Sequence, residues 1–398
     1  MTKKRRRPVP KRPGHSPAMH NPARRPPART SAAAKPAPAA HSLNTESGRI
    51  PKLFDPLDPQ GLAATYWLDT ATWEGPHDLT VRFCGTRAEG AVGSPPEQFE
   101  VYEDVDSIMP GTGRIAVTSR VSGITGGVWD VTATPVARTG RDPQRPAIAL
   151  PGRPSQRTTV HTRFHALAQG PGVHAWSWPV LVGLGAVLAV LLQALFLTRQ
   201  GIDPYGPVWL TILANAVGGV CARLWCLALN RQRLSSFFKT GACIQGFLAG
   251  ALSTIVAGSL IFGLPTGRIL DATAVGLFFG LALGRPGCFF SGCCYGRPTT
   301  SRWGLWSSDR KIGRLRYPVQ LYEAFLSLLT ALGTLAIALA APPGIPGLVF
   351  VGSITAYTLG RQLLFPLRVE SRTRRGRTLT IVVCTLILGA DLMLATLS

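Results

Sequence analysis

The chain has 398 residues, a formal net charge of +22 and an apolar content of 46%. Its eight cysteines show no spacing typical of a disulfide-stabilised secreted domain, which excludes that class. The strong positive charge would suit a nucleic-acid binder, but the long uncharged apolar stretches of the second half favour a membrane protein. We therefore expect no nucleic-acid partner.

The first segment, residues 1–49, is rich in Pro, Ala and Arg, and its first 45 residues carry eleven Lys or Arg and no Asp or Glu. Such a composition cannot bury enough apolar surface to fold, so we predict a disordered tail. Each basic residue near an anionic membrane surface contributes about 1 kcal/mol to binding. We expect the tail to bind anionic membrane lipid.

Residues 50–140 contain short runs rich in Val, Thr, Ile and aromatic residues, separated by Gly and Pro turns. These runs are Leu79–Phe83, Gln98–Tyr102, Arg114–Val121 and Val128–Val136. This spacing predicts a small antiparallel β-sandwich of the Ig-like kind. It contains no catalytic constellation, so we interpret it as an interaction module. The proline-containing segment 141–175 is predicted to be a linker.

Residues 176–398 contain stretches long and apolar enough to cross a hydrocarbon core of about 30 Å. These stretches are Trp176–Thr198, Pro204–Asn230, Thr240–Gly267, Ala272–Gly284, Pro318–Ala341, Gly344–Gly360 and Thr378–Leu397. The predicted fold class is an all-α polytopic membrane bundle of about seven transmembrane helices, preceded by the small β-sandwich.

The segment Gly284–Thr299 interrupts the fourth apolar stretch with a basic residue, Arg285. A charge within a span costs about 2.5–3.5 kcal/mol on insertion scales and usually faces a polar cavity. The Gly and Pro residues of this segment are expected to break the helix, which is tolerated where protein or water satisfies the backbone. The structural alternative is a re-entrant turn from which Arg285 reaches the membrane surface.

Two later segments also place polar groups within apolar stretches. Gln320 and Glu323 are three residues apart, so they share one face of a helix. An intramembrane acid is a functional candidate with an expected Arg partner. Arg361 ends the sixth stretch, and it and Arg368 could reach a lipid phosphate. The alternative is a Glu–Arg pair that only locks two helices together.

Taken in order, the segments Gly284–Arg297, Pro318–Ala324 and Tyr357–Arg361 resemble the prolipoprotein diacylglyceryl transferase family. The resemblance implies a multi-pass enzyme of the bacterial plasma membrane that acts in lipoprotein biosynthesis. Such an enzyme moves a diacylglyceryl group from phosphatidylglycerol to the lipobox cysteine of a prolipoprotein. The resemblance implies no metal and no organic cofactor.

The same resemblance gives candidate site residues. In it, Arg285 and Arg361 hold the phosphate, and Gly296 allows close packing. The expected catalytic residues are Arg285, Glu323 and Arg361, and the expected substrate-binding residues are Arg297, Tyr322, Gln320, Gln245 and Gly296.

The sequence departs from the family pattern at four positions. Cys288 and Ser291 replace asparagines, Cys293 replaces a glutamate, and Gln245 replaces the histidine proposed as a base. Because Gln cannot act as a general base, Glu323 is the first candidate for the proton acceptor, with Tyr322 and Cys293 as alternatives. The alternative function is a non-catalytic lipid-binding membrane protein that presents the β-sandwich; a transporter with broken helices is a weaker one.

The cysteines of the first motif, Cys288, Cys293 and Cys294, allow a metal or redox interpretation or the role of an acyl-type nucleophile, as well as simple packing. Vicinal cysteines rarely chelate one ion together and no histidine lies nearby in the sequence, so packing is preferred.

Membrane orientation is predicted in two opposite ways. Basic residues gather in the loops after the second, fourth and sixth apolar stretches, which places the N-terminus inside. The family resemblance implies the reverse, with the first motif at the outer leaflet. The sequence leaves both open.

Overall fold

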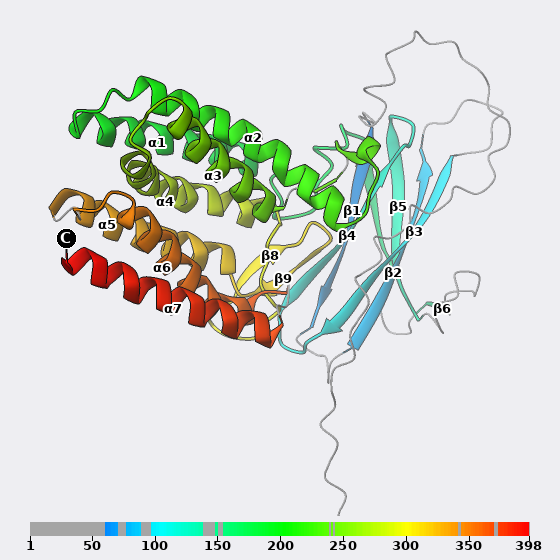
Figure 1. Cartoon of the computed structure of the whole chain (residues 1–398). Helices are drawn as coiled ribbons and strands as arrows, with labels where there is room; N and C mark the ends of the chain where they lie inside the picture. The colour runs from blue at the N-terminus through cyan, green and yellow to red at the C-terminus, as the bar shows by residue number, and fades with distance from the viewer. Residues whose placement is uncertain are drawn as a thin grey trace, which may run out of the picture. The chain divides into compact units, whose positions relative to one another are not determined.

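The computed structural model describes residues 60–70, 77–88, 97–137, 148–149, 154–238, 240–241, 243–340, 344–369 and 373–397. The predicted tail, residues 1–49, lies outside the described residues. Lys52–Ser398 forms one compact unit. This unit holds both the strands and the helices (Figure 1).

The strands form two sheets, and the pairs along both are antiparallel. The first has the order β1-β4-β9-β8, with β1 at Gly61–Asp69, β4 at Arg114–Ser122, β9 at Ile312–Arg316 and β8 at Leu305–Ser308. The second has the order β3-β2-β5-β6, with β3 at Gln98–Ile108, β2 at His77–Arg87, β5 at Val128–Ala137 and β6 at Ile148–Ala149. β7, Gln156–His161, also pairs with β5. The predicted small β domain is confirmed.

The core of this domain follows the period-two alternation of its strands. Alternate residues of β2 and of the first half of β5 are buried, among them Val81 and Trp129, whereas β4 is buried continuously over Ile115–Ser119. β1 was missed by the sequence reasoning, although Leu62, Ala64, Tyr66 and Leu68 alternate in it and are all buried. Its run GLAATYWLD is poor in β-branched residues, so the strand propensity is weak even where the alternation is regular.

The segment predicted as a linker, 141–175, contributes strands of its own. β7 pairs with β5 over six residues, from Val128↔His161 to Ala133↔Gln156. Beyond it, Gly61 and Arg163 exchange backbone hydrogen bonds of 2.7 and 2.8 Å. The second sheet therefore extends past residue 140, and the proposed domain bounds remain a prediction.

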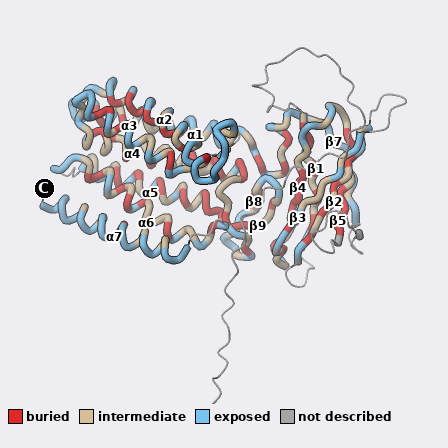
Figure 2. The backbone as a smooth tube through the Cα atoms, turned by 45° about the vertical axis from the view of Figure 1, so that its right-hand side comes forward, coloured by how far each residue is buried: buried red, intermediate tan, exposed pale blue. Residues whose placement is uncertain are grey.

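In the described part of the chain, seven helices are long and apolar enough to cross a membrane. They are α1 (Ser177–Arg199), α2 (Tyr205–Leu229), α3 (Ile244–Ile261), α4 (Thr266–Phe290), α5 (Val319–Ala340), α6 (Leu348–Leu364) and α7 (Arg374–Leu397). The predicted polytopic helical part is confirmed. α7 is exposed along most of its length, as expected for a helix that faces lipid (Figure 2).

The helix expected to break within Gly284–Thr299 ends there, at Phe290, but α4 first continues through Gly284, Arg285 and Pro286. Close packing against α1 explains why the helix tolerates them. A Cβ at Gly276 would lie 2.2 Å from the carbonyl oxygen of Ala189, and one at Gly287 would lie 2.9 Å from that of Ser177. Small residues let membrane helices approach this closely, which offsets their poor helix propensity.

The β8–β9 hairpin connects the helical part to the β-sandwich. It lies in the loop between α4 and α5, yet β9 pairs with β4 through Ala116↔Gly313 and Val117↔Ile312 (Figure 1). The Trp306 Nε1–H donates to the carbonyl oxygen of Arg114 over 2.9 Å. A loop of the membrane part thus completes a sheet of the N-terminal domain.

Candidate functional site

Glu323 is the centre of the candidate site. It lies in the first turns of α5, and its side chain is 1% exposed. Arg285 of α4 reaches one carboxylate oxygen, with an Nη1–Oε2 distance of 2.9 Å. Arg361 of α6 and Arg368 reach the other oxygen, with an Nε–Oε1 distance of 3.3 Å and an Nη1–Oε1 distance of 2.8 Å, respectively. Three guanidinium groups therefore surround one buried carboxylate.

The charges of this cluster do not balance. Glu323 neutralises one of the positive charges of Arg285, Arg361 and Arg368, which leaves a formal excess of two. The side chains of these arginines are only 16%, 23% and 5% exposed. Buried charges are costly unless they are paired, so the cluster favours a bound anion. Guanidinium groups match the geometry of a phosphate particularly well.

Polar atoms without partners adjoin the same cluster. Within the described residues, the Tyr357 hydroxyl and the Arg285 Nε atom are buried and make no hydrogen bond. The Arg361 guanidinium lies 5.9 Å from the centre of the Tyr357 ring, and the ring packs against Phe278. Buried polar groups are nearly always hydrogen-bonded, so these atoms are available to bind a polar ligand or water.

Gly296 and Arg297 hold the backbone that carries Arg368. The Arg297 backbone N–H donates to Leu367 over 2.7 Å, and its Nε–H donates to the Arg368 carbonyl over 2.8 Å. Gly296 forms an isolated antiparallel β-bridge with Arg368. A Cβ at Gly296 would lie 2.2 Å from the Tyr317 carbonyl oxygen. Only glycine fits at this position. These contacts fix the backbone at Arg368. The expected substrate-binding role of Gly296 and Arg297 remains a prediction.

The other expected substrate-binding residues are Gln320, Tyr322 and Gln245. The Gln320 side chain donates to the Cys293 carbonyl over 2.8 Å, and the Tyr322 hydroxyl donates to the Trp303 carbonyl over 3.3 Å. Gln245 lies in the first turn of α3 with an exposed side chain. No hydrogen bond or ion pair joins Gln245 to Glu323 in the described part of the chain.

The structure thus brings together Arg285, Glu323 and Arg361, and it adds Arg368 and Tyr357. The sequence reasoning treated Arg368 only as an interfacial residue that could reach a phosphate. No sequence signal was available for its place in the cluster, because Arg368 lies beyond the end of α6, after the turn Phe365–Leu367.

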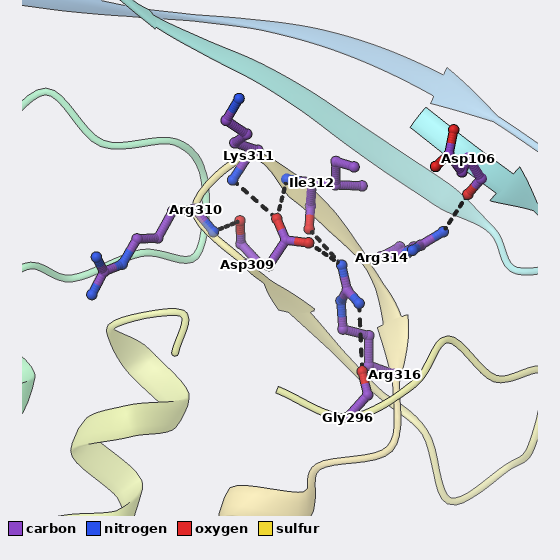
Figure 3. A network of polar contacts seen from close by, with 9 residues as sticks. Asp106, Gly296, Asp309, Arg310, Lys311, Ile312, Arg314 and Arg316 are labelled. Carbon is purple, nitrogen blue, oxygen red and sulfur yellow. Dashed lines mark hydrogen bonds and ion pairs between the residues drawn. The ribbon is translucent and has the colours of Figure 1, made fainter. Parts of the chain in front are cut away.

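Arginines of the β8–β9 hairpin also form ion pairs and hydrogen bonds with neighbouring segments (Figure 3). Arg316 is 1% exposed, forms an ion pair of 2.5 Å with Asp309 and donates to the Gly296 carbonyl over 3.4 Å. Arg314 donates to the Asp106 carbonyl of β3 over 3.3 Å. Burial lowers the pKa of Arg314 to about 10. These arginines tie the sandwich and the hairpin to the loop of Gly296.

Comparison with known proteins places the whole helical part in one family. The family model of prolipoprotein diacylglyceryl transferase matches residues 167–396, more than half of the chain. A phosphatidylglycerol–prolipoprotein diacylglyceryl transferase of Clostridioides difficile is 26% identical over 220 residues, which cover 50% of this chain and 81% of that protein. A protein of that name from Chloroflexus aggregans is 29% identical over 143 residues, 34% of this chain and 46% of that protein.

A third relative of the same name, from a Wolbachia species, is 35% identical over 96 residues, 24% of this chain and 36% of that protein. The family match begins after the strands β1 to β7, so the sandwich lies outside it. The matched region contains all seven helices and the cluster around Glu323. The chain belongs to the prolipoprotein diacylglyceryl transferase family.

Proposed function

We propose that this chain transfers a diacylglyceryl group from phosphatidylglycerol to the lipobox cysteine thiol of a prolipoprotein. The observation that carries the proposal is the excess of buried and partly buried guanidinium groups around the buried Glu323 carboxylate. Family membership and the names of the relatives support the same donor and acceptor. A scaffold that only binds lipid is not favoured, because every relative compared bears the name of the transferase.

The chemistry explains the guanidinium groups. The acceptor sulfur attacks the glyceryl carbon that bears the phosphate ester, a C–S bond forms and the C–O bond breaks. Glycerol phosphate departs with the electron pair of that bond, so negative charge grows on the phosphate in the transition state. Arg285 and Arg361 stabilise this charge as bidentate donors. Arg368 holds the Oε1 atom of Glu323, which it shares with Arg361.

The thiol proton needs an acceptor, because the thiolate is the nucleophile and a free thiol has a pKa of about 8.5. Gln245 stands where the family has a histidine, and an amide does not take up a proton at neutral pH. We assign this task to Glu323, the carboxylate at the centre of the site. Its three guanidinium partners keep it in place beside the phosphate.

The remaining residues are assigned to binding. The unpartnered Tyr357 hydroxyl donates to a phosphate oxygen of the donor lipid. Gln320 and Gly296 shape the loop between α4 and α5, and Arg297 positions Arg368. Tyr322 and Gln245 contact the glyceryl or acyl part of the lipid.

The same reaction sets the location. An exported prolipoprotein meets the enzyme at the outer leaflet of the bacterial plasma membrane, which is where we place the cluster and the β8–β9 hairpin. The basic tail, residues 1–49, binds anionic lipid at the surface.

The test is transfer by purified full-length protein in nanodiscs that contain labelled phosphatidylglycerol, with a lipobox peptide as acceptor. Arg285→Ala is expected to lower the rate by at least about 100-fold, as loss of a charge-stabilising donor does. Arg268→Ala is the matched control, since Arg268 is exposed at the other end of α4. Equal rates for both variants, or label on a peptide whose cysteine is replaced by serine, would refute the proposal.

A further inference from the structure

Three cysteine thiols converge beside the candidate site. Cys288 lies in the last turn of α4 and is 7% exposed, while Cys293 and Cys294 follow in the loop. Their three Sγ atoms all lie within 4.8 Å of one another. This is the only such group of three or more metal-ligand side chains among the described residues.

The loop that carries the thiols has a specific, hydrogen-bonded backbone conformation. The Cys293 N–H donates to the Cys288 carbonyl over 3.1 Å, which folds the chain back onto the helix end. Gly292 makes the turn with a φ of +69°, and Cys294 itself has a φ of +55°. A positive φ at a non-glycine residue is strained and persists where the surroundings enforce it.

Neighbouring side chains fix this loop from two directions. The Gln320 amide of α5 donates to the Cys293 carbonyl over 2.8 Å. The Arg310 Nε–H of the hairpin donates to the Ser291 carbonyl over 2.9 Å. The Ser291 hydroxyl lies 3.4 Å from the Cys293 sulfur. Such second-sphere contacts orient the ligands of metal sites.

Packing alone does not account for this arrangement, because Cys293 and Cys294 are only half-buried. We propose that Cys288, Cys293 and Cys294 bind one thiophilic divalent cation, for which Zn²⁺ is the representative ion. Zinc binds thiolates at about 2.3 Å, which puts the sulfurs of a tetrahedral site about 3.8 Å apart. Contraction of the spacing seen here by at most about 1 Å reaches that value.

Three protein ligands leave the fourth position of the tetrahedron to a water molecule or an external thiolate, as in catalytic rather than structural zinc sites. Two positively charged groups offset the charge of three thiolates around one divalent cation: Arg285 interacts electrostatically with Cys288 and Cys294, and Arg310 does so with Cys293. The site adjoins the Glu323 cluster through Arg285, but binding of a metal ion by the three thiols does not depend on the proposed transferase activity.

The test is titration of full-length, phosphine-reduced and metal-free protein in detergent with Co²⁺, followed by displacement with Zn²⁺. We expect one equivalent with a thiolate-to-cobalt charge-transfer band. Cys293→Ser and Cys294→Ser should each weaken binding by at least about 100-fold, more than loss of a second-sphere partner does. Cys384→Ser, and the pair Cys226→Ser with Cys243→Ser, are matched controls that should keep the band.

A second readout needs no variant. One equivalent of Zn²⁺ should protect the three thiols of the wild-type protein from alkylation, as mapped by mass spectrometry, and leave Cys384 unprotected. Absence of the band and of protection in folded protein would overturn the proposal. A band lost only in the Cys226 and Cys243 control, or a disulfide among the three thiols in protein isolated without reductant, would also overturn it.

Discussion

At the scale of single residues, the unusual feature is one buried acid shared by three arginines. Removal of one partner from a buried ion pair typically costs about 3–5 kcal/mol, because the remaining charge stays buried without compensation. Glu323 has three such partners. It is therefore as important for folding as for the proposed proton transfer.

Glu323→Gln should lower the free energy of unfolding by about 3 kcal/mol or more, since three guanidinium groups lose their counter-charge. The measurement is the thermal unfolding transition in detergent. Glu103→Gln is the control, because Glu103 pairs with the half-exposed Lys311, and pairs near the surface contribute about 0–1 kcal/mol. Equal transitions for both variants would show that the cluster carries no stabilising role.

Sequence reasoning identifies the centre of the site because charges within apolar stretches are rare and need partners. It predicts an Arg partner for Glu323, and the structure supplies Arg285 and Arg361. It does not predict Arg368 as the third partner. The turn Phe365–Leu367 after α6 directs Arg368 towards Glu323, and that turn has no sequence pattern of its own. Nor does it predict the free Tyr357 hydroxyl, which depends on what the neighbouring helices leave open.

At the scale of elements, the α1–α4 contact explains how the glycine-rich motif remains helical. Gly276 lies against the Ala189 carbonyl and Gly280 lies against the Gly185 carbonyl, so the helices touch through their backbones. The sequence analysis predicted a helix break within Gly284–Thr299 from the low helix propensity of glycine and proline, and α4 ends there only at Phe290, beyond Gly284 and Pro286. A close helix partner overrides that propensity.

Gly276→Ala should destabilise the protein, because its Cβ would lie 2.2 Å from the Ala189 carbonyl oxygen and the two backbones must separate. Gly183→Ala in α1 is the control: its Cβ meets nothing within 4 Å, and alanine favours a helix by about 0.5–1 kcal/mol over glycine. Thermal unfolding in detergent distinguishes the two. Equal or higher stability of Gly276→Ala would contradict the backbone contact.

The β8–β9 hairpin was the least predictable element. Its sequence is a basic loop between two apolar stretches, and only the sandwich supplies its pairing partner, β4. Trp306 anchors it through the Arg114 carbonyl and through stacking on Trp67, whose ring centre lies 6.0 Å away. Long-range pairing of this kind leaves no local signal.

Trp306→Ala should weaken the junction by about 2 kcal/mol, less than for a fully buried tryptophan. We expect faster hydrogen exchange at the Thr118 amide, which donates to the Lys311 carbonyl over 2.7 Å. Trp303→Ala is the control, since that side chain is 65% exposed. Unchanged exchange at Thr118 in Trp306→Ala would mean that the hairpin does not depend on this anchor.

At the scale of the whole molecule, one of the three basic loops, the loop between α4 and α5, has a structural explanation. Five basic residues of the loop between α4 and α5 have partners within the fold: Arg297, Arg310, Lys311, Arg314 and Arg316. The positive-inside rule counts residues that are free to face the cytoplasm. These residues make hydrogen bonds or ion pairs within the fold, so their number does not fix the membrane orientation.

The proposed reaction places the N-terminal sandwich outside, and an odd number of spans then places the C-terminus inside. A periplasmic phosphatase fused after residue 397 should be inactive, and a fluorescent protein at the same point should be bright. A fusion before α7, after residue 369, should give the opposite pair. An active phosphatase at the C-terminus would support the orientation given by the basic loops and contradict ours.

The most direct measurement is complementation. The chain is expressed in a bacterium depleted of its own diacylglyceryl transferase, and lipid labelling of a reporter prolipoprotein is followed. Labelling that requires Arg285 and Glu323 but not Arg268, in variants that accumulate equally in the membrane, is the predicted result. Absence of labelling by a folded, correctly oriented wild-type chain would contradict the proposed transfer reaction.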